Sequence, residues 1–398
     1  MSGVKNRFVF VVCGVREHID TLHFSLAALK QFTSLEILIV TDASKNEIPV
    51  QHEQVLNIST PAHFDNHQSA IYLKTGLHKF LPTGFTYCYL DTDVIALSKE
   101  ADDIFNQKKE IIAFAADHCS LSQFSPHAVN CGCEERNKKD RLEIQGLLEK
   151  YGYTYVNGPA LLPKQGLLKQ RLEVIKHNKG KLLISALKYL FSLSVFKLDD
   201  DYCYHKSKSY WSDAEGNPIL YEVSATVIKQ IEKNSAWHWN RRSRRWISPQ
   251  GNDIEWLACE HLRDAIYDKF KIDFNGQWQH WNGGVFLFDD YSHEFMETWH
   301  QNTRAIFDDP YWKTRDQGTL IATVWKLGLQ QAPLLSKKFN FIAYFYNPAL
   351  MLNPDKSAIS DNALVTQYKP AFIHVFDHFG VREWDVWDWI ENKLPGKS

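Results

Sequence analysis

The sequence predicts an α/β protein built on a mostly parallel, doubly wound sheet. Continuous apolar runs, typical of strands buried on both faces, recur at 7–13, 35–40 and 86–90. Segments with apolar residues at helical spacing separate them, at 19–31 and 68–80. This alternation of strand and helix is typical of parallel sheets that carry helices on both faces.

Polar or flexible residues stand where the expected strands end. Gly14 follows the first strand, Asp42 the second, and Asp91 and Asp93 the third. A further apolar run at 111–116 is followed by an aspartate and a histidine. Ligands of open α/β sheets bind beyond the carboxyl ends of the strands. We therefore expect a binding site at this edge of the sheet.

Asp91 and Asp93 form the most informative local pattern. Every second side chain of an extended segment shares a face, so the two carboxylates can point to one side. Such a pair can hold a hard divalent cation with open positions for phosphate oxygens. The pattern favours an enzyme that uses a nucleotide-diphosphate substrate, although a surface turn after a strand is the alternative.

The composition limits the class of protein. The chain has 398 residues, 44% hydrophobic and 23% charged, which is typical of a globular protein with a large core. The net charge of −2 gives no general attraction to nucleic acid, and we expect no nucleic-acid partner. The seven cysteines are spread along the chain rather than set out as a disulfide framework. With no signal-peptide pattern and no long apolar span, we expect a reduced, cytoplasmic protein.

The alternation of strand and helix patterns is interrupted at about 165–260 and returns from 275 to about 376. We interpret the middle region as an insertion and predict one catalytic domain over 1–398. Residues 179–198 are apolar nearly all round with flanking lysines. We favour a buried or partner-packed helix there, and a peripheral membrane contact is the alternative. The Trp- and Arg-rich segment 237–246 fits a solvated hairpin, an acceptor clamp or an RNA contact.

Three later features follow the Asp91/Asp93 pair in a fixed order. A Trp-Asn-Gly-Gly turn enters an apolar strand at 281–288, Asp316-Gln317 opens a helix that a Phe-Asn segment follows, and His374 lies in a short strand. This ordered set resembles the GT-A glycosyltransferases, most of all the family-8 group of glycogenin and the bacterial lipopolysaccharide galactosyltransferases. The resemblance covers roughly 7–117, the nucleotide-binding half, and 275–380, the acceptor-side half.

The resemblance implies a metal site. Asp91 and Asp93 would bind Mn²⁺ or Mg²⁺, with His374 as the third protein ligand; an imidazole beside two carboxylates favours a transition ion such as Mn²⁺. The segment after His374 departs from the family pattern of Gly-x-x-Lys-Pro-Trp. His378 is therefore a rival ligand, and Arg382 could replace the missing lysine at the diphosphate.

The resemblance also implies a nucleotide site at the ends of the first strands. Cys13, Gly14 and Val15 would lie beside the base, because glycine permits close backbone approach. Asp42 would face the base or the ribose. Lys74 would meet a phosphate or a sugar hydroxyl, with a solvated helix charge as the alternative.

On the sugar and acceptor side the resemblance implies Asn282, Asp316 and Gln317. An N-cap role for Asp316 is compatible with this. The implied reaction moves a sugar, with a UDP-sugar favoured, to a glycan or lipid-linked acceptor with retention of configuration. Inversion would need a general base, for which Asp289 and Glu294 are unsupported candidates.

Two other functions fit the same acidic pair. In a haloacid-dehalogenase-type phosphohydrolase the first aspartate is a nucleophile near the domain's start, whereas two strand–helix units precede Asp91 here. A non-catalytic sugar-nucleotide-binding protein would bind the donor without turnover.

A cluster of potential ligands lies between residues 117 and 133. It comprises Asp117, His118, Cys119, His127, Cys131 and Cys133. Their spacing fits no common zinc module. We favour reduced cysteines in a loop that borders the active site, with a structural zinc as the alternative.

Overall fold

The computed structural model describes residues 5–153, 161–344, 347, 350–353, 355–361, 366–382 and 384–394. The chain divides into two compact units. Unit 1 comprises Met1–Cys131, Ala258–Tyr344 and Lys369–Ser398, and unit 2 comprises Gly132–Leu257 and Phe345–Tyr368. The expected insertion at about 165–260 stays a prediction. That the whole chain forms one catalytic domain stays a prediction.

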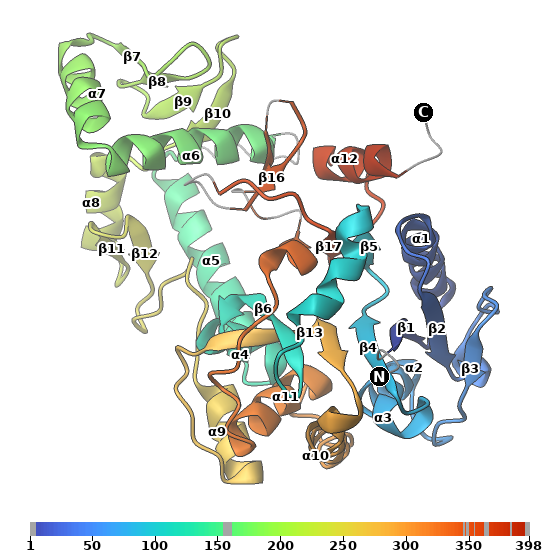
Figure 1. Ribbon diagram of the computed structural model, residues 1–398. Coiled ribbons are helices and arrows are strands. Elements are labelled where there is room, and N and C mark those ends of the chain that lie inside the picture. Colours follow the sequence, from blue (N-terminus) through green and yellow to red (C-terminus); the bar gives the residue numbers. More distant parts are fainter. Residues whose placement is uncertain are drawn as a thin grey trace. The chain divides into compact units, whose positions relative to one another are not determined.

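A six-stranded mixed sheet forms the centre of unit 1, in the order β3-β2-β1-β4-β13-β6 (Figure 1). The strands are β1 (Lys5–Val12), β2 (Glu36–Thr41), β3 (Val55–Asn57), β4 (Phe85–Leu90), β6 (Ala113–Ser120) and β13 (Gln279–Phe288). The first four in chain order run parallel, and β13 lies antiparallel between β4 and β6. The predicted α/β class with a mostly parallel sheet is therefore confirmed.

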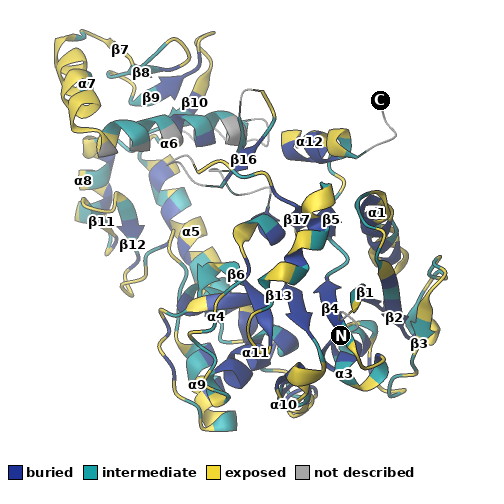
Figure 2. Ribbon diagram, in the orientation of Figure 1, coloured by how far each residue is buried: buried dark blue, intermediate teal, exposed yellow. Residues whose placement is uncertain are grey.

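Helices cover both faces of this sheet, as the doubly wound pattern predicts. On one face, Phe8 and Phe10 pack against α1 (Arg16–Phe32). On the other, Val9 and Val11 share a core with α2 (Asn66–Thr75), α3 (Leu77–Phe80), α10 (His293–Arg304) and α11 (Arg315–Lys326). The interiors of β1, β4 and β13 are buried (Figure 2). Burying each such large apolar side chain stabilises the fold by roughly 1.5–3 kcal/mol.

A second, three-stranded sheet positions the site. It has the order β14-β17-β5, with β5 (Val94–Ala96), β14 (Phe341–Ala343) and β17 (Phe372–Val375). β17 pairs antiparallel with β5 so that His374 lies opposite Val94. Because β5 begins directly after Asp93, this pairing brings a C-terminal histidine to the acidic pair. The other helices of unit 1 are α4 (Leu121–Ala128), α9 (His261–Phe270) and α12 (Asp385–Lys393).

Unit 2 combines helices with small antiparallel sheets. Its helices are α5 (Cys133–Lys150), α6 (Leu162–His177), α7 (Lys179–Phe191) and α8 (Ala225–Asn234). Four strands form one sheet: β7 (Val195–Lys197), β8 (Cys203–His205), β9 (Tyr210–Ser212) and β10 (Pro218–Tyr221). Two pairs complete it: β11 (His238–Asn240) with β12 (Arg245–Ile247), and β15 (Met351–Leu352) with β16 (Ile359–Ser360).

Two expectations for unit 2 change. The helix expected within 179–198 is not buried, because α7 is exposed along nearly its whole length (Figure 2). A helix packed on a partner, or a peripheral membrane contact, stays a prediction for this segment. Leu190 is 73% exposed and Phe191 84% exposed. The hairpin within 237–246 is present, but Trp237 and Trp246 lie in the core of unit 2 rather than in solvent. Their rings are therefore not available to stack on an acceptor or on RNA.

Among the described residues, no helix is both long enough and apolar enough to cross a membrane.

Candidate functional site

Asp91, Asp93 and His374 converge at the carboxyl end of β4. Each offers a ligand atom, and these atoms all lie within 4.8 Å of one another. His374 Nε2 lies 3.2 Å from Asp93 Oδ1; the histidine side chain is 6% exposed and that of Asp93 26%. The fold thus brings together the three residues expected to bind metal. Two carboxylates and one imidazole nitrogen suit Mn²⁺ and accept Mg²⁺.

His378 does not join this group in the part of the chain that the structure describes. Its Nδ1 atom lies 2.8 Å from Asp377 Oδ1. Of the two rival histidines, His374 is therefore the one beside the acidic pair. Burial lowers the pKa of His374, but Asp93 and Asp91 outweigh burial, and the net direction is upward.

A chain of hydrogen bonds orients His374. Its Nδ1 atom lies 3.1 Å from Asn340 Oδ1. The Asn340 amide donates to Asn282 Oδ1 at 3.1 Å, and the Asn282 amide donates to Asp117 Oδ2 at 3.1 Å. If Nδ1 carries the proton, Nε2 is left as the atom able to bind a cation. Such partners fix the tautomer and the ring orientation of metal-binding histidines.

Asp117 is the buried anionic end of this chain. Burial raises its pKa, but the hydrogen bond from His118 and the nearby His280 and Asn282 hold it well below the usual range. The His118 ring lies 2.7 Å from Asp117 Oδ1. The Asp117-His118 pair in β6 is thus connected to His374 through Asn282 and Asn340. The sequence flagged these residues only as possible ligands.

Lys74 is buried, contrary to the alternative of a solvated helix charge. Its ammonium lies 3.2 Å from Asp91 Oδ1 and 3.0 Å from Asp316 Oδ2. Burial lowers the pKa of Lys74, but the two carboxylates outweigh burial and hold its pKa above the ordinary value. The Tyr89 hydroxyl also donates to Asp91 Oδ1. Asp91 is thus fixed in place from two sides.

The turn at Gly283 and Gly284 passes between these side chains. The Gly284 carbonyl accepts from the Asp91 amide at 2.8 Å, and its own amide donates to Asn282 Oδ1 at 2.9 Å. A Cβ on Gly284 would lie 2.5 Å from His374 Cε1 and 2.9 Å from Asp91 Oδ2. Only glycine fits, because real Cβ atoms do not approach other atoms this closely.

Asp316 and Gln317 lie in the first turn of α11. The N-cap is Thr314, so the suggested capping role of Asp316 is not observed. The Asp316 carboxylate instead pairs with Lys74. The Gln317 side chain accepts from the Gly283 amide at 3.3 Å. Both residues therefore border the turn that leads to the metal-ligand group.

The expected nucleotide-binding residues lie at the ends of β1 and β2. Asp42 accepts from the amide and hydroxyl groups of both Ser44 and Thr60, at 2.6–3.1 Å. Burial raises the pKa of Asp42, but these bonds outweigh burial and lower it. The Asp42 amide donates to Cys13 Sγ at 3.4 Å. Asp42 thus anchors its loop, and its contact with a base or ribose stays a prediction.

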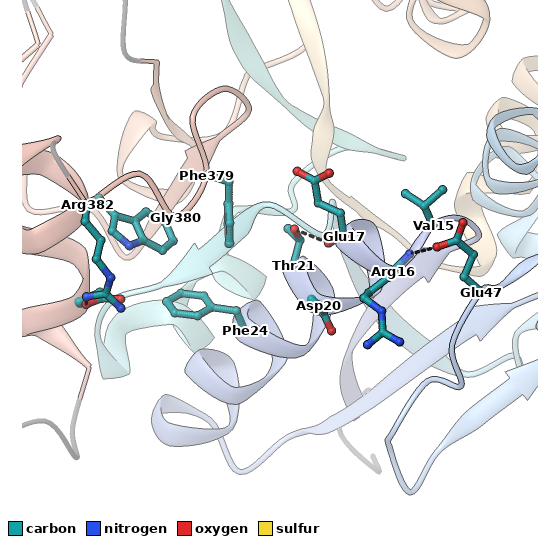
Figure 3. Close-up of a pocket in the computed structure, with 12 residues that line it drawn as sticks. Val15, Arg16, Glu17, Asp20, Thr21, Phe24, Glu47, Phe379, Gly380 and Arg382 are labelled. Atoms are coloured by element: carbon teal, nitrogen blue, oxygen red, sulfur yellow. Dashed lines mark hydrogen bonds and ion pairs between the residues drawn. The ribbon is translucent and has the colours of Figure 1, made fainter. Parts of the chain in front are cut away.

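The chain after β1 continues along a pocket of about 640 Å³ beside α1. Figure 3 shows Arg16 at one end and Arg382 at the other, with Phe24 and Phe379 between them. The Gly14 amide donates to Asn46 Oδ1 at 3.1 Å, and Val15 lines the pocket. None of the metal-ligand group lines it.

In the part of the chain that the structure describes, no contact joins either suggested general base to Asp91, Asp93 or His374. Asp289 lies 2.7 Å from Lys108 Nζ and caps a short helical turn. Glu294 is exposed in α10. Arg382 lies 3.3 Å from Glu391, and its suggested contact with a diphosphate stays a prediction.

Three supporting residues escaped the sequence analysis. Asn340 belongs to the Phe-Asn segment of the ordered set of motifs, but the sequence pattern does not predict its contact with His374. Gly284 stood in the flagged Asn-Gly-Gly turn without an assigned role. Tyr89 gave no signal, because an aromatic residue in a buried strand is ordinary.

Comparisons with known proteins bring only distant likenesses. No family model matches the chain, and no curated protein matches it. Mouse xyloside xylosyltransferase 1 is 7% identical over 85% of this chain and 88% of its own, with a TM-score of 0.34. The galactosyltransferase LgtC, in complex with donor and acceptor sugar analogues, is 9% identical over 98% and 97%, with a TM-score of 0.35. The bifunctional glycosyltransferase WbbM is 8% identical over 99% of this chain and 50% of its own, with a TM-score of 0.39. Because these scores are low, the function proposed below rests on the residues of the site.

Proposed function

We propose that this protein is a metal-dependent glycosyltransferase that transfers a sugar from a nucleotide-diphosphate sugar, preferably a UDP-sugar, to a glycan or lipid-linked acceptor. The single observation that supports the proposal most is the convergence of Asp91, Asp93 and His374 at the carboxyl end of a parallel strand. Ligand sites of open α/β sheets lie at this edge.

Asp91, Asp93 and His374 would hold Mn²⁺ or Mg²⁺. When bound there, the ion supplies positive charge that stabilises the departing diphosphate without proton transfer. The donor set fits this role, because the side chains of Asp91 and Asp93 are 31% and 26% exposed and leave the cation open to phosphate oxygens.

The neighbouring residues would position the donor sugar. Lys74 pairs with the carboxylates of both Asp91 and Asp316 and fixes their orientation. Gln317, whose Oε1 accepts from the Gly283 amide, would donate its amide hydrogens to a sugar hydroxyl. Asn282 is held by Asp117 and Asn340 and would support the turn. Because the Asp316 carboxylate is engaged by Lys74, it suits a positioning and charge-stabilising role better than that of a general base. This favours the retaining outcome.

The helix α7 favours a lipid-linked acceptor. Leu183, Leu190 and Phe191 are exposed in a helix that also carries Lys179, Lys181 and Lys188. Apolar side chains beside lysines suit the interface of an anionic membrane. We expect binding to vesicles containing phosphatidylglycerol, which a triple Gln variant of the three apolar residues loses. Leu142→Gln, which alters an exposed leucine in α5, is the control. Equal binding of both variants would remove this part of the proposal.

Thermal shift with UDP- and GDP-sugars tests the donor site. We expect the melting temperature to rise with one nucleotide class only when Mn²⁺ is present, and Asp93→Asn to abolish the rise. Asp268→Asn, at an exposed position in α9, should respond as the wild type does. An equal rise in Asp93→Asn would refute the site. Release of the nucleoside diphosphate in the presence of an acceptor library then separates an enzyme from a binding protein.

A further inference from the structure

A second group of potential metal ligands lies in unit 1, away from the residues used above. It comprises Cys131, Cys259 and His261, with one ligand atom of each within 4.8 Å of the others. Cys131 ends the segment where the chain leaves unit 1, and Cys259 follows Ala258, where the chain returns. The site therefore joins two segments that are distant in sequence.

The sulfur atoms are spaced for a shared metal ion. Cys131 Sγ lies 3.9 Å from Cys259 Sγ. Tetrahedral zinc with bonds of 2.3 Å holds two sulfurs about 3.8 Å apart. A disulfide would require about 2.05 Å. All seven cysteines lie in the described part of the chain, and none forms a disulfide. The spacing thus fits metal binding better than a covalent bridge.

Hydrogen bonds hold Cys259 and its neighbours in place. The Cys259 amide donates to the Ser122 carbonyl at 2.9 Å. Ser125 Oγ accepts from the Leu262 amide at 2.9 Å and lies 3.1 Å from Cys259 Sγ. Since the serine oxygen already accepts, its hydroxyl proton can be donated to the sulfur. Ser125 thus fixes the position of the Cys259 sulfur.

The segment carrying Cys131 is equally well supported. Val129 forms a β-bridge with Trp312, and the Asn130 amide donates to the Tyr311 carbonyl at 2.7 Å. Val129 and Trp312 belong to a buried cluster against which Cys131 packs. Both cysteine-bearing segments are thus fixed on one core. A preorganised site of this kind is typical of structural zinc.

We propose that Cys131, Cys259 and His261 bind a zinc ion that fastens the points where the chain leaves and re-enters unit 1. Thiolate ligands select zinc over Mn²⁺ and Mg²⁺, so this ion is distinct from the one at Asp91 and Asp93. Binding releases the thiol protons and involves no oxidation.

Metal analysis of the full-length protein tests the proposal. We expect about one zinc per chain after purification without chelator. Cys131→Ser and Cys259→Ser should lose the zinc and melt at a lower temperature. Cys203→Ser, in β8, should keep it, because Cys203 belongs to no potential ligand group of the described residues. Asp93→Asn should keep it too, which separates this site from the proposed donor site.

A second measurement covers variants that do not fold. Co²⁺ exchanged into the wild type should give the intense visible bands of tetrahedral thiolate coordination. Zinc-free wild-type protein with no such cobalt spectrum would overturn the proposal. A Cys131–Cys259 disulfide found by mass spectrometry without reductant would also overturn it, as would full zinc retention in Cys259→Ser.

Discussion

The ammonium of Lys74 lies 3.0 Å from the carboxylate of Asp316, with both side chains almost completely buried. The pair joins the end of α2 to the first turn of α11. The same ammonium contacts Asp91 at 3.2 Å. Lys74 therefore connects the buried pair with Asp316 to the proposed metal site.

Lys74→Met should destabilise the protein by roughly 3–5 kcal/mol, because removing one partner leaves a buried charge uncompensated. Urea unfolding measures this loss. The double variant Lys74→Met/Asp316→Leu should lose less stability than the sum of the losses in the two single variants, because it leaves no unpaired buried charge at position 316. A Lys74→Met variant within about 0.5 kcal/mol of the wild type would show that the pair contributes little.

Gly284→Ala should abolish donor and metal binding. The added methyl group would meet His374, Asn282 and Asp91 at 2.5–2.9 Å, and the resulting overpacking costs about 1–3 kcal/mol. Gly283→Ala is the matched control, because its nearest contact would be Lys74 Nζ at 3.5 Å. Thermal shift with Mn²⁺ and a UDP-sugar distinguishes them. Equal responses of the two variants would contradict the close packing around Gly284.

The sheet could be predicted from the sequence because its strands are buried on both faces. Segments such as 7–13 and 86–90 are continuously apolar and end in polar residues, which marks both their type and their direction. The break at Gly76 was not predicted, since the helical spacing of 68–80 continues through it. For α7 the sequence left a buried helix and a partner-packed helix open, because an apolar helix has the same pattern in both cases.

Contacts between distant residues limited the prediction of the site. Asp91, Asp93 and His374 were found through an ordered set of motifs, but the Asn340–Asn282–Asp117 chain joins residues that share no periodic pattern. The cysteines were grouped by nearness in sequence, whereas the fold places Cys131 with Cys259 and leaves Asp117, His118 and Cys119 as a separate group. The sequence shows which side chains can bind a metal, but the tertiary fold determines which of them lie together.

Asn340→Asp should separate the two roles of Asn340. The carboxylate still accepts from His374 Nδ1 but cannot donate to Asn282 Oδ1, so His374 keeps its orientation and Asn282 loses a bond. Asn340→Ala removes both bonds and should weaken Mn²⁺ binding roughly 10–100-fold. Calorimetric titration with Mn²⁺ compares the variants. Wild-type affinity in Asn340→Ala would show that His374 needs no such support.

Stability should fall as the pH drops from about 6.5 to about 4, partly because of His280. Burial lowers its pKa to about 4, and the side chain is fully buried beside Phe124. The unfolded chain therefore binds a proton in this window that the folded protein does not, which costs about 1.4 kcal/mol per pH unit. His280→Phe keeps the ring packing and removes the titrating group. We measure its free energy of unfolding in urea across this window. The slope of that free energy against pH should be smaller than in the wild type, by an amount equivalent to about one bound proton. An unchanged slope would mean that His280 becomes protonated in the folded protein as readily as in the unfolded chain.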